Sequence, residues 1–178
     1  IQEQDANKNV VFEWHCKDHF AIDDAYPFFL YSPVNVVWTH CNSIHLDDDG
    51  NILLSVRHFS EVTKINRTDS SIIWRFGGKH NEFTFLSDTT PFVGQHDVRR
   101  IANGHITIFD NGYFSAPHST RALEYAVDEV NKTADLKWSY IYDSAMTSTA
   151  MGNVQRLWNG NTVIDYGLVS ANKNICFT

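Results

Sequence analysis

Two histidines and an arginine–histidine pair carry side chains suited to nucleophilic or acid–base chemistry on an anionic group. The histidines are His40 and His96, and the pair is Arg57-His58, which follows a short apolar run. A neutral imidazole is a nucleophile and a proton acceptor near neutral pH. A guanidinium offers a planar set of donors to an oxyanion. These groups act together only if the fold brings their segments to one place.

Three segments share one hairpin pattern that would provide the framework for these side chains. Each has a short strand with alternating apolar residues, an Asp-Gly or Asn-Gly turn and a second strand. The turn glycines Gly50, Gly104 and Gly160 supply the positive φ that a tight hairpin needs. They recur at intervals of 54 residues (50 to 104) and 56 residues (104 to 160). Two further strands follow each of the first two hairpins, and the last one carries a tryptophan, Trp74 or Trp138.

Four-stranded antiparallel units at this spacing predict an all-β protein, a β-propeller of four-stranded blades. We expect residues 1–178 to form a single, partial propeller region of about three blades. The expected pieces are the end of an earlier blade at about 10–15 and blades at about 40–77, 95–141 and 152–178. His40 and His96 then stand at or just before the innermost strands of consecutive blades, which point toward the axis. So few blades cannot close a ring, so the rest of the propeller or other copies of the chain would complete it.

Composition and charge argue against several classes of partner. The chain has 14 Lys and Arg against 21 Asp and Glu, a formal net charge of −7. This disfavours binding to nucleic acid or to an anionic membrane surface. No apolar run approaches the roughly 20 residues of a membrane-spanning helix. No group of cysteines or histidines has metal-ligand spacing, so we expect neither a metal nor a cofactor.

Two glycosylation sequons and three cysteines favour a secreted, extracellular protein. Asn66 and Asn131 begin the sequons and fall where turns are expected. Cys16 and Cys41 are candidates for a disulfide between adjacent blades, which leaves Cys176 for a partner outside this stretch. The chain opens without a basic segment followed by an apolar one. We therefore expect either no signal peptide or a mature or trimmed product.

Seven segments occur in order: Thr39-His-Cys-Asn-Ser-Ile, Leu54-Ser-Val-Arg-His-Phe-Ser-Glu-Val-Thr-Lys-Ile, Ile73-Trp-Arg-Phe-Gly-Gly-Lys, Gly94-Gln-His-Asp-Val-Arg-Arg-Ile, Ile108-Phe-Asp-Asn-Gly, Ser119-Thr-Arg-Ala-Leu-Glu-Tyr and Gly152-Asn-Val-Gln-Arg-Leu. The series resembles the arylsulfotransferase (arylsulfate sulfotransferase-like, ASST) β-propeller family from about Val10 to Gly167. The resemblance implies a six-bladed propeller with its site in the central funnel. It also implies transfer of sulfate between phenolic compounds through a sulfated histidine, without a nucleotide sulfate donor.

From their strand positions, His40 and His96 are the candidate catalytic residues, one as nucleophile or acid–base group and one as an oxyanion partner. The alternative is that they hydrogen-bond neighbouring blade loops. Candidates for binding the phenolic or sulfated ligand are Arg57, His58, Arg100 and Arg121. Strand alternation lets only one of Arg99 and Arg100 face the funnel, and an ion pair between blades is an equal alternative for Arg121. Where the third hairpin would offer a histidine in register with His96, the chain has Met151-Gly152. This departure leaves catalysis open.

A second hypothesis is a non-catalytic extracellular glycoprotein whose propeller serves as a binding or self-assembly module. The missing histidine, the incomplete blades with bare strand edges and the sequons motivate it. The two hypotheses differ in whether imidazole and guanidinium groups converge on one space large enough for an anion. We interpret the remaining histidines as ordinary surface or loop residues: His15, His19, His45, His80, His105 and His118.

Overall fold

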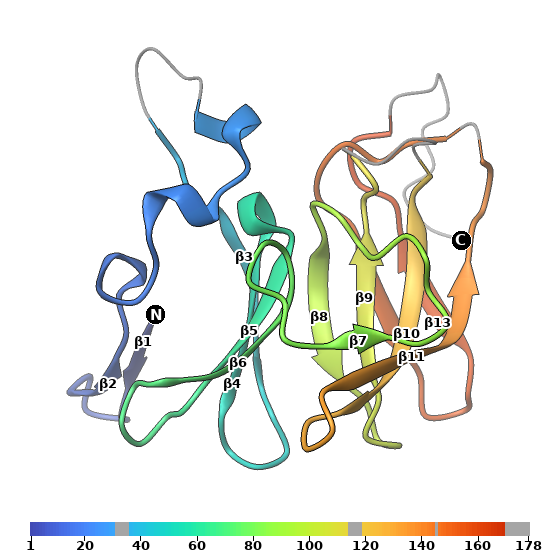
Figure 1. The fold of residues 1–178 in the computed structure, drawn as a ribbon. Helices are drawn as coiled ribbons and strands as arrows, with labels where there is room; N and C mark the ends of the chain where they lie inside the picture. Colours follow the sequence, from blue (N-terminus) through green and yellow to red (C-terminus); the bar gives the residue numbers. More distant parts are fainter. Residues whose placement is uncertain (31–35, 114–118, 145, 170–178) are drawn as a thin grey trace.

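The computed structural model describes residues 1–30, 36–113, 119–144 and 146–169, and within them it is built of β-strands and short 3₁₀ helices (Figure 1). The strands are β1 (Gln2–Gln4), β2 (Val10–Glu13), β3 (Cys41–Leu46), β4 (Ile52–Val56), β5 (Glu61–Ile65), β6 (Ile72–Gly77), β7 (Thr84–Phe85), β8 (His96–Arg100), β9 (Ile106–Asp110), β10 (Arg121–Asp128), β11 (Thr133–Tyr140), β12 (Asn153–Arg156) and β13 (Thr162–Asp165). The 3₁₀ helices are η1 (Cys16–Asp18), η2 (Ile22–Asp24), η3 (Pro27–Leu30) and η4 (Arg57–Phe59). The predicted all-β class is confirmed for these residues. His118 and Cys176 lie outside them.

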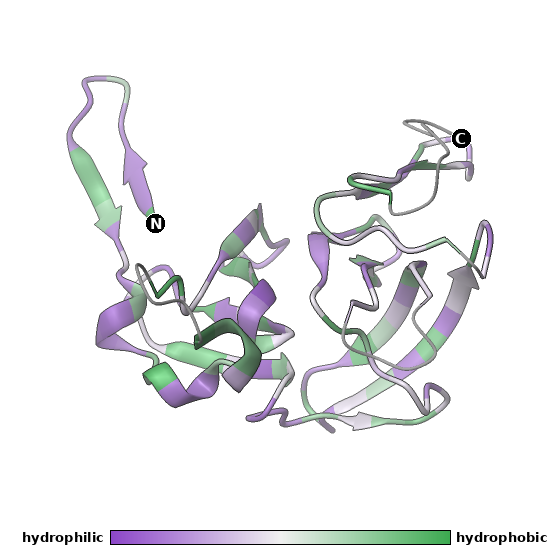
Figure 2. Ribbon diagram, turned by 90° about the horizontal axis from the view of Figure 1, so that it is seen from above, coloured by the Kyte–Doolittle hydropathy of each residue, from purple (hydrophilic) through white to green (hydrophobic). Residues whose placement is uncertain are grey.

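The strands form two large sheets and two hairpins. The first sheet has the order β3-β4-β5-β6 and is antiparallel throughout. The second sheet has the order β8-β9-β10-β11, with the short β7 added parallel to β11. β1-β2 forms the N-terminal hairpin and β12-β13 the third hairpin. Figure 2 shows the two large sheets side by side from above, with the N-terminal hairpin projecting away from them.

The short strand β7 lies on the outer edge of the second sheet, and it was not predicted from the sequence. The backbone N–H of Thr84 donates to Lys132 O at 2.8 Å, and that of Leu86 donates to Ala134 O at 2.9 Å. The segment that leads from the first sheet to the second thereby pairs with β11. An edge strand that would otherwise present unpaired backbone groups to solvent is partly covered. Two residues are too few to give a periodic signal in the sequence.

The three turns led by Asp-Gly or Asn-Gly share one geometry. In each, the glycine N–H donates to the carbonyl three residues earlier, and Gly50, Gly104 and Gly160 have φ of 82°, 82° and 86°. The predicted positive φ is confirmed at all three. The residues before the glycines are not left-handed, so each loop is a type I turn closed by a left-handed glycine rather than a two-residue primed turn.

Both faces of each large sheet are covered, which explains why β4 and β9 are buried along their whole length. The cluster between the two sheets includes Leu53, Trp74, Phe76, Ile108 and Tyr125. The cluster between the first sheet and the N-terminal segment includes Trp14, Phe20, Leu54 and Phe59. The cluster between the second sheet and the third hairpin includes Phe109, Val154, Ile164 and Tyr166. Successive residues of a strand thus enter different clusters, and the sheets stack as layers.

Side-chain hydrogen bonds hold the first strands of the three hairpins next to one another. Ser43 Oγ accepts the N–H of Val98 at 3.0 Å, which joins β3 to β8. Asp97 Oδ2 accepts the N–H of Val154 at 2.9 Å, which joins β8 to β12. The chain therefore brings the starts of β3 and β8 together, and these starts carry His40 and His96.

Two buried tryptophans make the same kind of contact with the next unit along the chain. Trp14 Nε1 donates to Ser70 O in the β5–β6 turn at 3.1 Å. Trp74 Nε1 donates to Glu129 Oε2 in the β10–β11 turn at 2.8 Å. Trp14 and Trp74 thus occupy corresponding places, although β2 pairs with β1 in a separate two-stranded sheet.

Candidate functional site

Three imidazoles and one guanidinium gather where β3, β4 and β8 meet. The ring centroids of His40 and His58 are 4.8 Å apart, and those of His40 and His96 are 6.3 Å apart. The charge of Arg57 lowers the pKa of each of the three histidines, so its guanidinium lies within electrostatic reach of them. Four of the six predicted catalytic and ligand-binding residues therefore lie in one cluster.

Local backbone distortions accompany both strand starts. The register of β3 against β4 shifts between Cys41 and Ser43, and that of β8 against β9 shifts between His96 and Arg99. His40 has a φ of 51°, a left-handed conformation that costs a non-glycine residue about 1–3 kcal/mol. Bulges and strained residues of this kind redirect side chains and cluster at functional sites.

The short helix η4 holds Arg57 and His58 against the start of β3. Its backbone is tied there by two hydrogen bonds, from Arg57 N to His40 O at 3.1 Å and from His58 N to Thr39 O at 3.2 Å. Ser60 ends the helix in a left-handed conformation with φ of 52°. Arg57 and His58 therefore follow the second strand of the unit, as predicted, and lie beside His40.

His96 is buried, and its hydrogen bonds define which ring nitrogen carries the proton. Its Nδ1 lies 2.7 Å from Asn111 Oδ1, while its Nε2 accepts the N–H of Met151 at 3.2 Å. Burial lowers the pKa of His96 to about 4, with the charges of Arg57 and His40 acting in the same direction. The imidazole is thus neutral at pH 7, with its lone pair on Nε2.

His58 is also neutral and fixed in one tautomer. Its Nδ1 lies 2.5 Å from Val37 O, and because a carbonyl can only accept, Nδ1 carries the proton. The ring stacks on Phe29 with centroids 3.7 Å apart. Burial lowers the pKa of His58 to about 4. Its Nε2 is therefore a second unprotonated nitrogen.

Arg57 is a buried cation that pairs with no carboxylate of the described residues. Its side chain has one hydrogen bond, from Nη2 to Thr149 O at 2.9 Å, and its buried Nε has no partner in the described part of the chain. The guanidinium lies 5.5 Å from the Phe29 ring centroid and 5.7 Å from that of Tyr113. A buried charge without a counterion is costly, and a bound anion would offset that cost.

His40 differs from the other two histidines because its side chain is exposed. Within residues 1–30, 36–113, 119–144 and 146–169, neither of its ring nitrogens has a hydrogen-bond partner. Partial burial and the charge of Arg57 lower its pKa below the ordinary 6.5. A neutral imidazole with both nitrogens available can accept a proton from one ligand and deliver it to another.

Arg100 lies away from this cluster. It is the last residue of β8, whereas His96 is the first, and its guanidinium contacts Asp47 at 2.7 Å and Glu129 at 2.7 Å. Lys64 joins the same network through Asp47 at 2.9 Å and Glu129 at 2.9 Å. Because its donors are engaged by two carboxylates, the structure does not bring Arg100 to the site, and its expected ligand-binding role does not fit this placement.

Arg121 contributes to the site indirectly, through ion pairs at the end of β9. It pairs with Asp110, its neighbour in the same sheet, at 2.8 Å and with Asp88 at 3.4 Å, so its ion pair with Asp110 lies within one sheet and not between two blades. Asp110 Oδ1 also accepts the N–H groups of Val93 and Gly112, both at 2.9 Å. Arg121 therefore holds the end of β9, immediately before Asn111.

Cys16 and Cys41 face each other with sulfur atoms 3.6 Å apart, and both are thiols in this structure. A disulfide has an S–S bond of about 2.05 Å, so the pairing stays a prediction. The hydrogen bond from the Cys41 thiol lowers the pKa of Cys16 to about 7, which favours thiol–disulfide exchange.

We expect treatment with a low-molecular-weight disulfide to join Cys16 to Cys41, because the sulfurs need to approach by only about 1.5 Å from their 3.6 Å separation. The measurement is a peptide map of the unreduced protein. A Cys16→Ser variant is the matched control and should show Cys41 as a mixed disulfide. A map in which both thiols of the oxidised wild type stay unlinked to each other would contradict the pairing.

Most other histidines of the described chain contact a neighbouring carboxylate or aromatic ring outside the cluster. His15 lies beside Glu13, His80 beside Asp24 and His105 beside Glu124, while His19 stacks on Trp14. No group of three or more histidine, cysteine or carboxylate side chains in the described segments could hold a metal ion.

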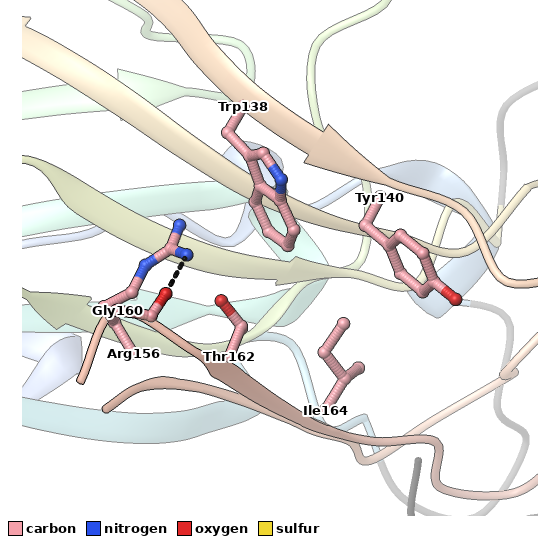
Figure 3. Close-up of a pocket in the computed structure, with 6 residues that line it drawn as sticks. All are labelled: Trp138, Tyr140, Arg156, Gly160, Thr162 and Ile164. Carbon is pink, nitrogen blue, oxygen red and sulfur yellow. Dashed lines mark hydrogen bonds between the residues drawn. The ribbon is translucent and has the colours of Figure 1, made fainter. Parts of the chain in front are cut away.

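A separate cavity of about 340 Å³ lies between β11 and the third hairpin (Figure 3). Trp138 and Tyr140 of β11 face Thr162 and Ile164 of β13 across it, and the Arg156 guanidinium stacks 4.9 Å from the Trp138 ring. It contains none of the predicted catalytic or ligand-binding residues.

Two kinds of contributor to the histidine cluster were not predicted from the sequence. Asp110-Asn111 occupies in the second unit the position that Arg57-His58 occupies in the first. This correspondence was the signal in the sequence that could have identified Asn111. Phe29 and Tyr113 frame Arg57 but come from segments between strands, where no periodicity marks them.

The fold and site define an all-β protein with neutral histidines beside a buried arginine. The sequence model of the family Arylsulfotransferase (ASST) matches residues 1–176. The chain therefore belongs to the arylsulfotransferase family, and the resemblance stated from its motifs is confirmed. A comparison with curated protein sequences found no match to the chain.

Proposed function

We propose that this protein transfers sulfate from an aryl sulfate to a phenolic acceptor through a covalent intermediate on His96. The observation that carries the proposal is the buried guanidinium of Arg57, which lacks a carboxylate partner among the described residues and lies beside three neutral imidazoles. The sulfuryl group of an aryl sulfate has three terminal oxygens that share a negative charge and suit the donors of a guanidinium. The family membership supports the same activity.

In the first half-reaction, the Met151 N–H releases Nε2 of His96, and the freed lone pair attacks the sulfur of the donor. The S–N bond forms, the bond from sulfur to the aryl oxygen breaks, and the electron pair leaves with that oxygen as a phenolate. Arg57 stabilises the negative charge on the sulfuryl oxygens. The proton on Nδ1 of His96 stays in place and remains bound to Asn111 Oδ1.

In the second half-reaction, His40 accepts the proton of the acceptor phenol. The phenol oxygen attacks sulfur, the S–N bond breaks and its electron pair returns to Nε2 of His96. His40 then gives its proton to the departing phenolate of the next donor, which balances the cycle. His58 keeps its neutral form and supports this arrangement by stacking on Phe29.

An apolar cavity of about 370 Å³ suits the aryl part of the substrates. It is lined by Tyr26, Pro27, Phe28 and Val93. The volume falls in the usual range for small-molecule sites, which are mostly apolar with a few polar groups. The cavity adjoins the cluster because Tyr26 N donates to His58 O at 3.1 Å and the Phe28 ring lies 6.3 Å from that of Tyr113.

We also propose that the two large sheets are blades of a β-propeller and that the third hairpin begins another blade. The adjacent first strands, the shared turn geometry and the matching tryptophan contacts support this reading. The expected ring of six blades, completed by the rest of the propeller or by other copies of the chain, belongs to the same proposal.

Secretion and glycosylation at Asn66 and Asn131 remain proposals. Both sequons lie in turns between the third and fourth strands of a sheet, and the Asn131 side chain is exposed. In the part of the chain that the structure describes, no helix has the length and apolar character needed to cross a membrane.

The proposed function predicts acceptor-dependent release of phenol from a chromogenic aryl sulfate. Without an acceptor, we expect a burst of one equivalent of phenol per protein molecule, because the sulfuryl group stays on His96. With a second phenol, turnover continues and follows ping-pong kinetics. Stopped-flow absorbance measures the burst, and mass spectrometry detects the sulfated acceptor. Absence of both products would favour the non-catalytic binding module.

A further inference from the structure

We propose that Asn111 is a positioning residue that selects the tautomer of His96 with the lone pair on Nε2. Its importance for sulfate transfer rests on the proposed function, but the tautomer itself does not. Residue type alone does not indicate this role for Asn111, and only its side-chain contacts point to it.

The two ends of the Asn111 side chain are identified by their partners. Nδ2 donates to Ser148 O at 3.0 Å and to Met151 O at 2.9 Å. Both partners are carbonyl oxygens, which only accept, so the amide nitrogen must be on their side. Oδ1 therefore faces Nδ1 of His96, 2.7 Å away.

This orientation fixes the proton on the ring. Oδ1 can only accept, so Nδ1 of His96 must be the donor. Asn111 is fully buried and His96 is 8% exposed, so water cannot readily substitute for the lost partner if the proton moves to Nε2. The other tautomer would place two lone pairs, Oδ1 and Nδ1, against each other in a buried site.

The same amide also holds the segment that faces Nε2. Met151 has a φ of 63°, and its N–H donates to His96 Nε2 at 3.2 Å. Nδ2 of Asn111 donates a hydrogen bond to the carbonyl oxygen of Met151. The amide thus links the two sides of the ring, because its oxygen sets the proton at Nδ1 and its nitrogen holds Met151 opposite the Nε2 lone pair.

The test measures the tautomer by ¹⁵N NMR of ring-labelled histidine in the full chain at pH 7. In the wild type, we expect Nδ1 of His96 to be protonated and Nε2 unprotonated. In Asn111→Leu, which keeps the number and branching of the side-chain heavy atoms but removes the acceptor, we expect a mixture of tautomers. We also expect kcat to fall by at least about 10-fold with little change in KM, as when an orienting partner is lost.

Two further variants separate positioning from a purely structural role. Asn111→Asp keeps an acceptor at Nδ1 but loses the amide donors, so we expect the Nε2 lone pair to be retained and the pKa of His96 to rise. Thr120→Val is the matched control. Thr120 Oγ1 donates to Asn111 O and accepts the N–H of Ser148 without touching His96, so this variant should leave the tautomer unchanged.

The outcomes distinguish this inference from the proposed function. A single wild-type tautomer in folded Asn111→Leu, or equal loss of that tautomer in Thr120→Val, would overturn the positioning role. A wild-type protein without transfer activity but with the expected tautomer shift in Asn111→Leu would overturn the proposed function and leave the role of Asn111 standing.

Discussion

Replacing His96 with glutamine is expected to lower the rate of sulfate transfer by at least about 10³-fold, because the variant has no nitrogen that can form the covalent intermediate. Glutamine retains a polar side chain of similar reach, so the buried Asn111 amide keeps a partner. The measurement is kcat/KM for a chromogenic aryl sulfate at saturating acceptor. We also expect the burst of phenol to disappear completely.

The pH dependence gives a second test of the same residue. The pKa of His96 is lowered to about 4 by burial, so the nucleophile stays unprotonated at neutral pH and is lost as the pH falls through that value. We expect the wild-type rate to decline on the acid side and the residual rate of His96→Gln to lack this nucleophile-dependent limb.

His45→Gln is the matched control for this substitution. His45 lies on β3 and is partly exposed, and it has no role in the proposed chemistry. We expect its kcat/KM to stay within about twofold of the wild type. A His96→Gln protein that is folded by circular dichroism and still shows a burst would contradict covalent catalysis at His96.

Replacing Asp47 with asparagine is expected to lower the free energy of unfolding by about 3 kcal/mol, because it leaves two buried cations short of a counterion. The side chains of Asp47, Lys64 and Arg100 are 2%, 3% and 8% exposed. Lys64 and Arg100 each bond Asp47 directly, and the bond from Arg100 crosses the boundary between the two large sheets. The measurement is the midpoint of urea unfolding at pH 7, with the slope of the transition checked for constancy.

Acid should remove the difference in the free energy of unfolding between Asp47→Asn and the wild type. Hydrogen bonds from Arg100 and Lys64 hold the pKa of Asp47 below its usual value despite the opposing effect of burial. A carboxylate of this kind stabilises the fold above its unfolded pKa of about 3.9, and the contribution is lost as the pH falls through its folded pKa. The wild type should therefore lose stability toward that of Asp47→Asn in strong acid.

Asp49→Asn provides the control, since Asp49 contacts the same lysine at 2.7 Å but its side chain is 48% exposed. We expect this change to cost less than about 1 kcal/mol, as for other exposed ion pairs. Equal losses in the two variants would show that burial does not set the strength of the network.

The turn glycines and apolar alternation predicted the framework of the protein well. Gly50, Gly104 and Gly160 mark the three hairpins because only local backbone conformation decides where such a turn forms. β7 could not be predicted in this way. Its two residues become a strand because β11 presents an edge nearby, and that edge exists only after the second sheet has formed.

The candidate site was predicted in part and for a similar reason. His40, His96 and the Arg57-His58 pair stand at the ends of strands whose positions the repeating pattern fixes. Arg100 also stands on a first strand, but the side chains opposite it, Asp47 and Glu129, come from the β3–β4 and β10–β11 turns. Residue type could not reveal whether an arginine meets carboxylates or an open space.

The sequence by itself determined the all-β class, the positions of the hairpins and the family, because each depends on local backbone preference or on an ordered series of motifs. Tertiary structure decided which charges are neutralised and which nitrogen of His96 carries its proton. Those properties depend on groups distant in the chain, such as Asn111 opposite His96 and Thr149 opposite Arg57. Burial then amplifies every such contact, because a polar group removed from water has few alternative partners.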